Sequence, residues 1–288
     1  MKFLRVGERG NEIPAILDDK NNIRNLSNIF KDLTPENLNF ENLDKIKNFD
    51  INSLPLLDQN QRIGSCVIKP ANFFAIGLNY KAHAEELGNT VPTEPLLFLK
   101  PPSTLIGEEQ PIYYPSQSQQ VDYEGELALV IGEVTKNCSE KEAQSKIWGY
   151  TIANDVTARD FQRKDNQWVR AKGFDTFCPL GPWVIRELSA AASIQTFVNN
   201  EEEPRQSALV QDMIFSPQVI VSYISQILTL FPGDVILTGT PEGVGPVSIG
   251  DRIRVEIEGI GSIENPVMSE PTANMTTSEP ENKQPQKS

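Results

Sequence analysis

The sequence reads Asp122-Tyr-Glu124-Gly-Glu126 at the start of the apolar run 121–131, and this run predicts one long strand. Successive side chains of a strand point to opposite faces, so Glu124 and Glu126 are expected on the same face with only Gly125 between them. Two carboxylates held side by side repel each other. The motif therefore predicts a positively charged partner at this point.

A third acid follows at the end of the next apolar strand, residues 147–155, where Asp155 precedes a helix expected to begin at Thr157. An acid at the mouth of a buried strand is costly unless it finds a partner. Glu124, Glu126 and Asp155 thus form a candidate set of three oxygen ligands, which suits Mg²⁺, Mn²⁺ or Ca²⁺ better than zinc. About three coordination positions would stay open for water or substrate. The alternative for each acid alone is an ordinary surface carboxylate.

Three further polar side chains lie close to these acids in the sequence. Lys172 sits in an apolar segment, where its charge could balance the acids or hold an oxyanion. Arg159 and Gln162 are three residues apart and share one helix face. They could grip a substrate carboxylate, or they could simply solvate the helix.

The only histidine, His83, follows the strand expected at 73–78 and lies in a short helix expected between residues 79 and 88. Glu86 comes one helical turn later, so the two side chains can meet. A carboxylate beside an imidazole holds its tautomer, raises its basicity and favours a general base near neutral pH. The alternative is a solvated histidine with an incidental acidic neighbour.

The composition bounds the class of protein. The chain has 288 residues with 39% apolar content, enough for an ordinary core in one large domain or in a small and a large one. No apolar run approaches the roughly 20 residues that a bilayer requires, and no signal-peptide core follows Met1, so we expect a soluble, cytoplasmic protein. The net charge of −13 argues against a nucleic-acid partner. A small acidic substrate would need cations placed locally.

Three cysteines, Cys66, Cys138 and Cys178, form no C-x-x-C pair. Their odd number indicates neither a disulfide framework nor a zinc site. We expect buried thiols in a reducing compartment.

The ends of the chain differ from its middle. Residues 1–66 predict short strands at 3–6 and 13–17 and a polar helix that begins near Pro35, without titratable groups in evident pairs, so we expect a small N-terminal domain with a structural role. Residues 67–267 form the expected catalytic domain. From Met268 onward the chain is polar and aperiodic, and we expect residues 268–288 to be disordered.

The last part of the catalytic region predicts a hairpin over 194–210 and a helix from Ser216-Pro217, which ends at Pro232-Gly233. The apolar stripe of this helix is expected in the core and comprises Val219, Ile220, Tyr223, Ile224, Ile227, Leu228 and Phe231. A strand over 234–238 then enters the glycine-rich loop around Thr240, whose backbone could approach a ligand. Strands at 251–258 and 260–267 are expected to pair.

Five motifs together resemble the fumarylacetoacetate hydrolase family over residues 73–267. They are Asn79-Tyr80 with His83 and Glu86, Asp122-Tyr-Glu124-Gly-Glu126, Asn154-Asp155-Val-Thr-Ala-Arg159-Asp160, Lys172-Gly-Phe-Asp-Thr-Phe-Cys178-Pro, and Pro232-Gly-Asp-Val-Ile-Leu-Thr-Gly239-Thr240-Pro241. The resemblance implies an α+β, β-rich fold, in which a mixed β-roll catalytic domain carries a small N-terminal domain, and usually a homodimer.

The resemblance also implies roles for particular residues. The metal site of the family, which usually holds Mg²⁺ or Mn²⁺, corresponds to Glu124, Glu126 and Asp155. The catalytic His-Glu pair corresponds to His83 and Glu86, and the family lysine corresponds to Lys172. The residues that contact the substrate correspond to Arg159, Gln162 and Thr240. The long form of the family has an extra aspartate near the Asn-Tyr pair, where this chain has Lys81 and Ala82. We therefore do not expect fumarylacetoacetate itself as the substrate.

The expected activity is hydrolysis of a C–C bond in a 2,4-diketo acid, either an acylpyruvate or a diketo sugar acid. His83 would activate a water that attacks the 4-carbonyl, and Lys172 would help to stabilise the enolate that leaves. A keto-acid tautomerase, isomerase or decarboxylase is the alternative on the same site. A third hypothesis is a catalytically silent protein that only binds metal or a partner.

Overall fold

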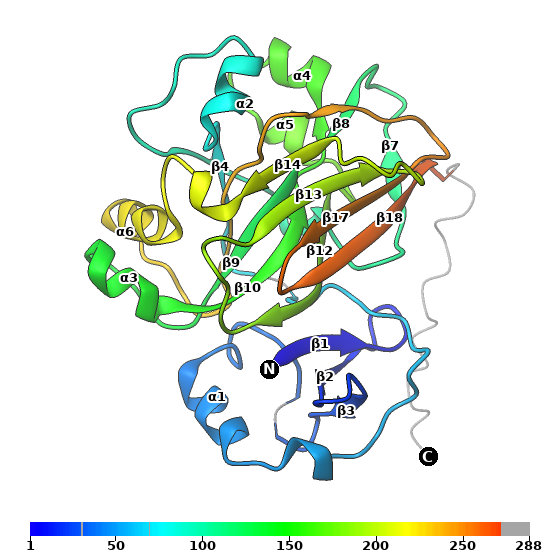
Figure 1. Cartoon of the computed structure of the whole chain (residues 1–288), viewed down its shortest axis with the longest axis vertical. Helices are drawn as coiled ribbons and strands as arrows, with labels where there is room; N and C mark the ends of the chain where they lie inside the picture. Colours follow the sequence, from blue (N-terminus) through cyan, green and yellow to red (C-terminus); the bar gives the residue numbers. More distant parts are fainter. Residues whose placement is uncertain (30, 69, 272–288) are drawn as a thin grey trace, which may run out of the picture.

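The largest element of the fold is a ten-stranded sheet that runs through the whole molecule (Figure 1). This structure is a computed structural model, and it describes residues 1–29, 31–68 and 70–271. In spatial order the strands of the sheet are β3 (Ile23–Asn25), β2 (Ile13–Leu17), β1 (Lys2–Val6), β12 (Cys178–Ile185), β10 (Ile147–Asn154), β9 (Gly125–Ile131), β15 (Val235–Leu237), β4 (Phe73–Gly77) and β5 (Leu96–Leu99), with β6 (Leu105–Ile106) paired to β12 outside this path.

Two smaller sheets complete the β structure. A five-stranded sheet packs against β9, β10 and β12 and has the order β14 (Gln206–Leu209), β13 (Ser193–Val198), β17 (Arg252–Ile257), β18 (Gly261–Ser269) and β7 (Ile112–Tyr114). A three-stranded sheet has the order β11 (Thr157–Ala158), β8 (Val121–Tyr123) and β16 (Gly245–Pro246). The expected β-rich α+β fold is confirmed.

The helices are short and lie around the sheets. They are α1 (Phe40–Lys47), α2 (Lys81–Glu86), α3 (Glu140–Lys146), α4 (Arg159–Lys164), α5 (Val169–Lys172) and α6 (Pro217–Ile227), with 3₁₀ turns η1 (Ile51–Ser53), η2 (Pro102–Thr104) and η3 (Val210–Asp212). Ser216 caps α6 as expected, because its side chain accepts a hydrogen bond from the Val219 amide. Helix α1 begins later than Pro35, since Asn39 supplies its N-cap. None of the helices within the described ranges is long and apolar enough to cross a bilayer.

Strand β9 is buried on both faces, and this explains its unbroken apolar sequence. Leu127, Leu129 and Ile131 belong to the core cluster that reaches the five-stranded sheet. Ala128 and Val130 belong to a second cluster that includes the N-terminal helix α1. Alternate side chains of one strand therefore hold the two halves of the core together.

The expected single strand over 121–131 is wrong, because the chain changes sheets at Glu124. Residues before it pair in the small sheet as β8, and residues after it pair with β10 as β9. The Glu124 amide donates instead to the side chain of Asn154 at 3.0 Å. A Cβ on Gly125 would lie 2.2 Å from Thr196 Oγ1, so the crossing needs glycine.

Two other local expectations are also wrong. The residues from Thr157 form β11 rather than a helix, and α4 begins only at Arg159. Helix α6 ends at Ile227, before Pro232, because Leu228 already has an extended backbone. Ile227 and Phe231 are therefore 56% and 45% exposed instead of lying in the core.

The N-terminal region contains paired charges that the sequence pattern did not reveal. Buried Arg5 lies 2.6 Å from Asp32 and 3.3 Å from Glu12, and Glu12 also pairs with Arg62 at 2.7 Å. These partners are 7 to 50 residues apart in the sequence, so no local spacing announces them. The network is consistent with the expected structural role. The domain division at residue 66 stays a prediction.

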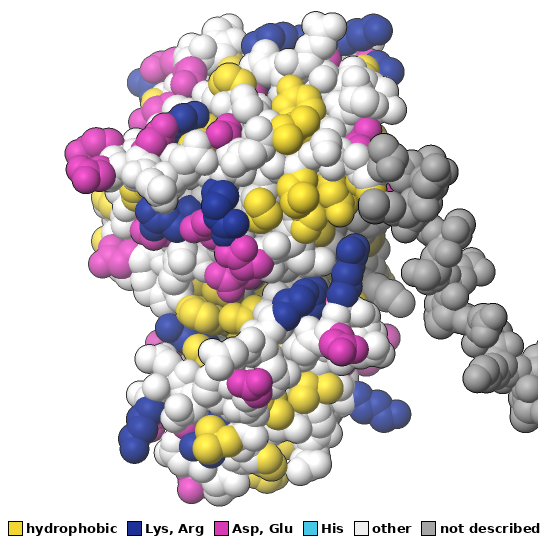
Figure 2. Space-filling model, turned by 90° about the vertical axis from the view of Figure 1, so that its right-hand side faces the viewer, with side chains coloured by type: hydrophobic (Ala, Val, Ile, Leu, Met, Phe, Trp, Pro, Cys, Tyr) yellow, Lys and Arg dark blue, Asp and Glu magenta, His cyan; other side chains and the backbone are white. Residues whose placement is uncertain are grey.

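The surface carries charges of both signs, and the cysteines are buried. Figure 2 shows Lys and Arg interspersed with Asp and Glu on one face, without a continuous field of one sign. All three cysteines are buried and free, as expected, and burial raises the pKa of the Cys66 thiol to about 12. Met268 belongs to β18 and not to the expected tail, and residues 272–288 lie outside the described ranges.

Candidate active site and metal centre

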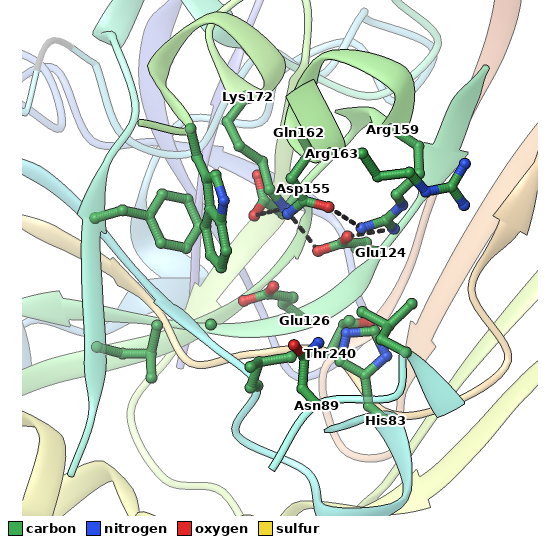
Figure 3. Close-up of a pocket in the computed structure, with 16 residues that line it drawn as sticks. His83, Asn89, Glu124, Glu126, Asp155, Arg159, Gln162, Arg163, Lys172 and Thr240 are labelled. Atoms are coloured by element: carbon green, nitrogen blue, oxygen red, sulfur yellow. Dashed lines mark hydrogen bonds and ion pairs between the residues drawn. The ribbon is translucent and has the colours of Figure 1, made fainter. Parts of the chain in front are cut away.

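One cavity of about 320 Å³ collects nearly all the residues that the sequence singled out (Figure 3). Its walls come from α2, β4, β5, α4, α5 and the loop after β15. The predicted residues that line it are His83, Glu124, Glu126, Asp155, Arg159, Gln162, Lys172 and Thr240. Glu86 stands behind His83 and does not line the cavity.

The three predicted ligands meet at the base of this cavity. Glu124, Glu126 and Asp155 are buried, and one oxygen of each lies within 4.8 Å of the others. The β9–β10 pairing places Asn154 opposite Gly125, and the Asp155 amide donates to the Glu124 carbonyl at 2.8 Å. Sheet register therefore brings together acids that are about 30 residues apart.

Lysines partly balance this charge. Lys172 Nζ lies 2.7 Å from Glu124 Oε2 and 2.6 Å from Asp155 Oδ2. Lys100, which the sequence analysis missed, places its buried Nζ 2.6 Å from Asp155 Oδ1 and donates to the Lys172 carbonyl at 2.6 Å. Lys172 is protonated, since Asp155 and Glu124 raise its pKa against the opposing effect of burial.

Arg159 binds acids of the protein in this structure. Its Nε donates to Asp122 Oδ2 at 2.8 Å and its Nη2 donates to Glu124 Oε1 at 2.7 Å, while Nη1 donates to Gln162 Oε1. Each donor-bearing nitrogen thus already has a partner. Lys172 and Arg159 hold the pKa of Glu124 well below its usual range, although burial alone would raise it.

The donor set fits a divalent ion. Three of the carboxylates, Asp122, Glu124 and Asp155, pair with the three cations Lys100, Arg159 and Lys172. Glu126 accepts a hydrogen bond from the Gly239 amide at 2.6 Å but pairs with no cation in the described chain. Burial, with Asp155 and Glu124 nearby, raises its pKa well above the usual value. Asp155 Oδ1 contacts Lys100 Nζ at 2.6 Å, and no other group among the described residues donates to it. Oxygen donors short of positive charge suit Mg²⁺, Mn²⁺ or Ca²⁺.

The histidine and its acidic partner meet as expected. His83 Nδ1 lies 3.3 Å from Glu86 Oε2, and Glu86 is held in turn by the Gly243 amide at 3.0 Å. Asn79 anchors the start of α2, because its side chain donates to the carbonyls of Phe215 and Thr238 at 3.0 and 2.7 Å.

Glu86 favours the protonated form of His83, as expected, but the net change in the pKa of His83 is downward. Its side chain is only 4% exposed, and burial lowers its pKa more than Glu124 and Glu86 raise it. The imidazole is therefore neutral at pH 7 and able to accept a proton.

Thr240 closes the site on the side of the glycine-rich loop. Its hydroxyl donates to the Gly125 carbonyl at 2.9 Å and accepts a hydrogen bond from Gln206 at 2.8 Å. Gln206 also accepts from the Gly125 amide at 2.9 Å. This ring of contacts fixes the backbone between Glu124 and Glu126.

The sequence analysis missed the aromatic wall of the cavity. Trp168 packs edge-on against Phe98, with ring centroids 5.2 Å apart. A Cβ on Gly77 would lie 2.8 Å from the Trp168 ring, so the tryptophan depends on this glycine. Asn89 and Arg163 also line the cavity. No periodic signal marks these residues, because distant segments bring them together.

Comparisons with known proteins place the chain among relatives of known family. The family model described as "Fumarylacetoacetate (FAA) hydrolase C-terminal" matches residues 72–268. The 2,4-didehydro-3-deoxy-L-rhamnonate hydrolase of Sphingomonas sp. (strain SKA58) is 40% identical over 273 residues, which are 91% of this chain and 94% of the relative.

Two solved structures are similar over most of the chain. The 5-carboxymethyl-2-hydroxymuconate delta-isomerase from Mycobacterium smegmatis has a TM-score of 0.78 at 37% identity, with 94% of this chain and 100% of that chain covered. The fumarylacetoacetate hydrolase from psychrophilic Exiguobacterium antarcticum has a TM-score of 0.81 at 33% identity, with the same coverage.

Proposed function

The chain belongs to the fumarylacetoacetate hydrolase family, and we propose that it is a divalent-metal-dependent hydrolase that cleaves a C–C bond of a 2,4-diketo acid. The observation that carries this proposal is the cavity itself. A neutral, buried His83 and the acids Glu124, Glu126 and Asp155 line the same space of about 320 Å³. A base and a metal-binding cluster thus both face one small substrate.

Glu124, Glu126 and Asp155 would hold the ion, with Mg²⁺ or Mn²⁺ as the proposed metals. When bound, such an ion supplies Lewis acidity that polarises a substrate carbonyl. Substrate contacts from Gln162, Arg159 and Thr240 remain part of the proposal, with the limit that Arg159 and Thr240 already bind other groups of the protein.

The acid–base step belongs to His83. Its neutral imidazole takes a proton from a water molecule, whose hydroxyl adds to C4 of the substrate. Glu86 orients the ring through Nδ1 and favours the positive charge that the ring gains. A placed general base of this kind contributes roughly 10²- to 10⁴-fold to the rate.

Bond cleavage follows when the C3–C4 electron pair stays with C3. C4 leaves as the carboxylic acid, and C3 takes a proton to give pyruvate or a related keto acid. Lys172 carries a fixed positive charge beside this developing enolate, because two acids hold its ammonium group in place. Lys172 thus acts as a cation and does not act as the base.

The test is an assay with Mg²⁺ or Mn²⁺ over a panel of acylpyruvates, diketo sugar acids and oxaloacetate, with mass detection of products. We expect two fragments, loss of turnover on chelation, and a large fall in kcat for His83→Ala. Lys164→Gln, on the exposed side of α4, is the matched control and should behave as wild type. Turnover of His83→Ala within a few-fold of wild type contradicts the assigned base.

An isomerase or tautomerase is the second candidate function, and the solved isomerase structure at 37% identity favours it. Enolisation of a keto acid needs only the bound ion, Lys172 and a proton carrier. The residues proposed for the hydrolase could therefore also catalyse an isomerisation. A product of unchanged mass identifies this activity, and loss of CO₂ identifies a decarboxylase. Binding of Mg²⁺ without turnover of any acid in the panel would support a catalytically silent protein.

The cellular partners are proposals of the same kind. We expect a homodimer that acts on a small keto acid and binds neither nucleic acid nor membrane. Light scattering on the purified protein measures the mass of the assembly directly.

A further inference from the structure

The glycine-rich loop between β15 and β16 contacts both parts of the site through its backbone. Near its start, the Gly239 amide donates to Glu126 Oε2 at 2.6 Å. Further along the loop, the Gly243 amide donates to Glu86 Oε1 at 3.0 Å. One loop therefore binds a proposed metal ligand and also the acid that orients His83.

The Gly243 amide keeps the Glu86 carboxylate in place. Both oxygens of the carboxylate accept from this amide, at 3.0 and 3.2 Å, and Oε2 also lies 3.3 Å from His83 Nδ1. No other group in the part of the chain that the structure describes donates to this carboxylate. The side chain of Glu86 is 35% exposed, so water competes for its oxygens. The orientation of Glu86, and with it that of the His83 ring, therefore depends on where the loop holds Gly243.

Tyr123 anchors the loop at this point. Its hydroxyl donates to the Gly243 carbonyl at 2.8 Å, and its backbone pairs with Gly245, two residues further along the loop. The chain passes so close that a Cβ on Gly245 would lie 3.2 Å from the same hydroxyl. Gly243 has a φ of +92°, and a glycine has many other conformations open to it unless a contact fixes it. The hydroxyl of Tyr123 supplies such a contact.

The position of Tyr123 in the strand explains why its side chain faces the loop. Asp122 and Glu124, the residues on either side of it, both contact Arg159, at 2.8 and 2.7 Å, so their side chains lie on one face. Side chains alternate along an extended chain, which places that of Tyr123 on the opposite face. It is 2% exposed there. The segment that carries a metal ligand on one face thus anchors the loop on the other.

We propose that Tyr123 is a positioning residue for the general base: its hydroxyl holds Gly243 so that the Gly243 amide keeps Glu86 against the Nδ1 edge of the His83 ring. This inference rests on the proposed function, since it concerns the base of the same reaction. An acid at Nδ1 keeps the ring proton on that nitrogen and leaves Nε2 free to take a proton from water. Once Glu86 turns towards solvent, both tautomers of the neutral ring are populated, and only one of them has Nε2 free.

The single histidine of the chain gives a direct measurement. In untagged protein that contains ¹⁵N-labelled histidine, the ring signals come from His83 alone and show which nitrogen carries the proton. These spectra are recorded at neutral pH without substrate. Separate assays with Mg²⁺ give kcat and KM for the 2,4-diketo acids, and calorimetry gives the affinity for Mg²⁺. The variants are Tyr123→Phe, Glu86→Ala, the double variant and a control.

Tyr150→Phe is the matched control. Tyr150 is 7% exposed, its hydroxyl accepts a hydrogen bond from Gln144 at 2.9 Å, and it does not line the cavity of the proposed active site. In both tyrosines the substitution removes one oxygen and keeps the ring. Gly243 is unsuitable for substitution, because a Cβ there would lie 1.9 Å from the Arg205 carbonyl.

We expect the wild-type ring to carry its proton on Nδ1. Tyr123→Phe should give a mixture of both tautomers and lower kcat by roughly three- to tenfold, with KM within about twofold of wild type. The affinity for Mg²⁺ should also stay within about twofold, because Gly239 holds Glu126 through a separate contact. The double variant should be no slower than Glu86→Ala, since Tyr123 acts through Glu86. Tyr150→Phe should match wild type.

A wild-type tautomer and wild-type kcat in Tyr123→Phe overturn the proposal and leave the hydrolase standing. A lower kcat with unchanged ring signals also overturns it, because the effect then does not pass through His83. An equal change in Tyr150→Phe, a further loss in the double variant, weaker binding of Mg²⁺, or failure of Tyr123→Phe to fold shows a general structural role and overturns the specific one. If Tyr123→Phe changes the tautomer but wild type turns over none of the acids, the proposed hydrolase fails and the positioning role stands.

Discussion

Lys100→Met should destabilise the protein strongly, because Lys100 is a fully buried cation between two fixed acceptors. Its Nζ lies 2.6 Å from Asp155 Oδ1 and 2.6 Å from the Lys172 carbonyl, and its side chain has no exposed surface. Methionine keeps the volume of the side chain and removes the charge. The substitution thus isolates the electrostatic contribution of Lys100 from its packing.

The magnitude follows from these contacts. Removal of one partner from a buried ion pair costs about 3–5 kcal/mol. Asp155 keeps Lys172 as a second partner at 2.6 Å, which favours the lower end, about 3 kcal/mol. At roughly 2–4 °C per kcal/mol for a chain of this size or slightly smaller, Tm should fall by roughly 6–12 °C. The substitution removes one positive charge from the cluster, so saturating Mg²⁺ should restore part of the loss.

Thermal unfolding followed by circular dichroism, with chelator and with saturating MgCl₂, measures both effects. Lys45→Met is the control, since Lys45 pairs with Glu41 at 2.9 Å while 52% exposed, and such pairs contribute about 0–1 kcal/mol. A loss in Lys100→Met no larger than in Lys45→Met refutes the reasoning about the buried pair. An equal loss with and without Mg²⁺ refutes the link to the metal site.

Three other measurements test separate parts of the structure. His83 must be unprotonated to act as a base, and burial lowers its pKa below the ordinary 6.5. The value of kcat/KM should therefore stay constant as the pH falls to 6.5 and should decline only below it. A decline that begins at or above pH 6.5 contradicts this reasoning. Gly77→Ala should push Trp168 into the cavity, raise KM several-fold and shift tryptophan emission, because the new Cβ would lie 2.8 Å from the ring; unchanged KM and emission argue against this wall. No cysteine should react with a thiol reagent at mildly alkaline pH until the protein is unfolded, since all are buried and the pKa of Cys66 is raised to about 12; rapid labelling of the folded protein disagrees with that burial.

Local patterns predicted the parts of the site that lie within one turn or one strand. His83 and Glu86 meet because residues three apart share a helix face, and the sequence shows that spacing directly. The acids of the cluster were also found, although the single strand assumed for two of them does not exist. They meet because β9 pairs with β10, and both strands are buried along their whole length.

Contacts between distant segments could not be predicted from spacing. Lys100 contacts Asp155 and Lys172, which are 55 and 72 residues away in the sequence. Its position at the end of an apolar strand does not predict either contact. Phe231 looked like core because it continues the stripe of α6, yet the helix ends four residues earlier and the side chain is 45% exposed. The pattern gives the period of a helix more reliably than its last residue.

Because β1 pairs with β12, the region that the family model matches is smaller than the unit that folds. The family match begins at residue 72, but β12 inside it takes its outer neighbour from residues 2–6, and Phe3 packs on Trp148 with ring centroids 4.9 Å apart. A truncation placed at the family boundary would leave β12 with a row of unpaired amides and carbonyls at a new edge, which invites aggregation. Expression of the catalytic region therefore calls for the first strand to be kept.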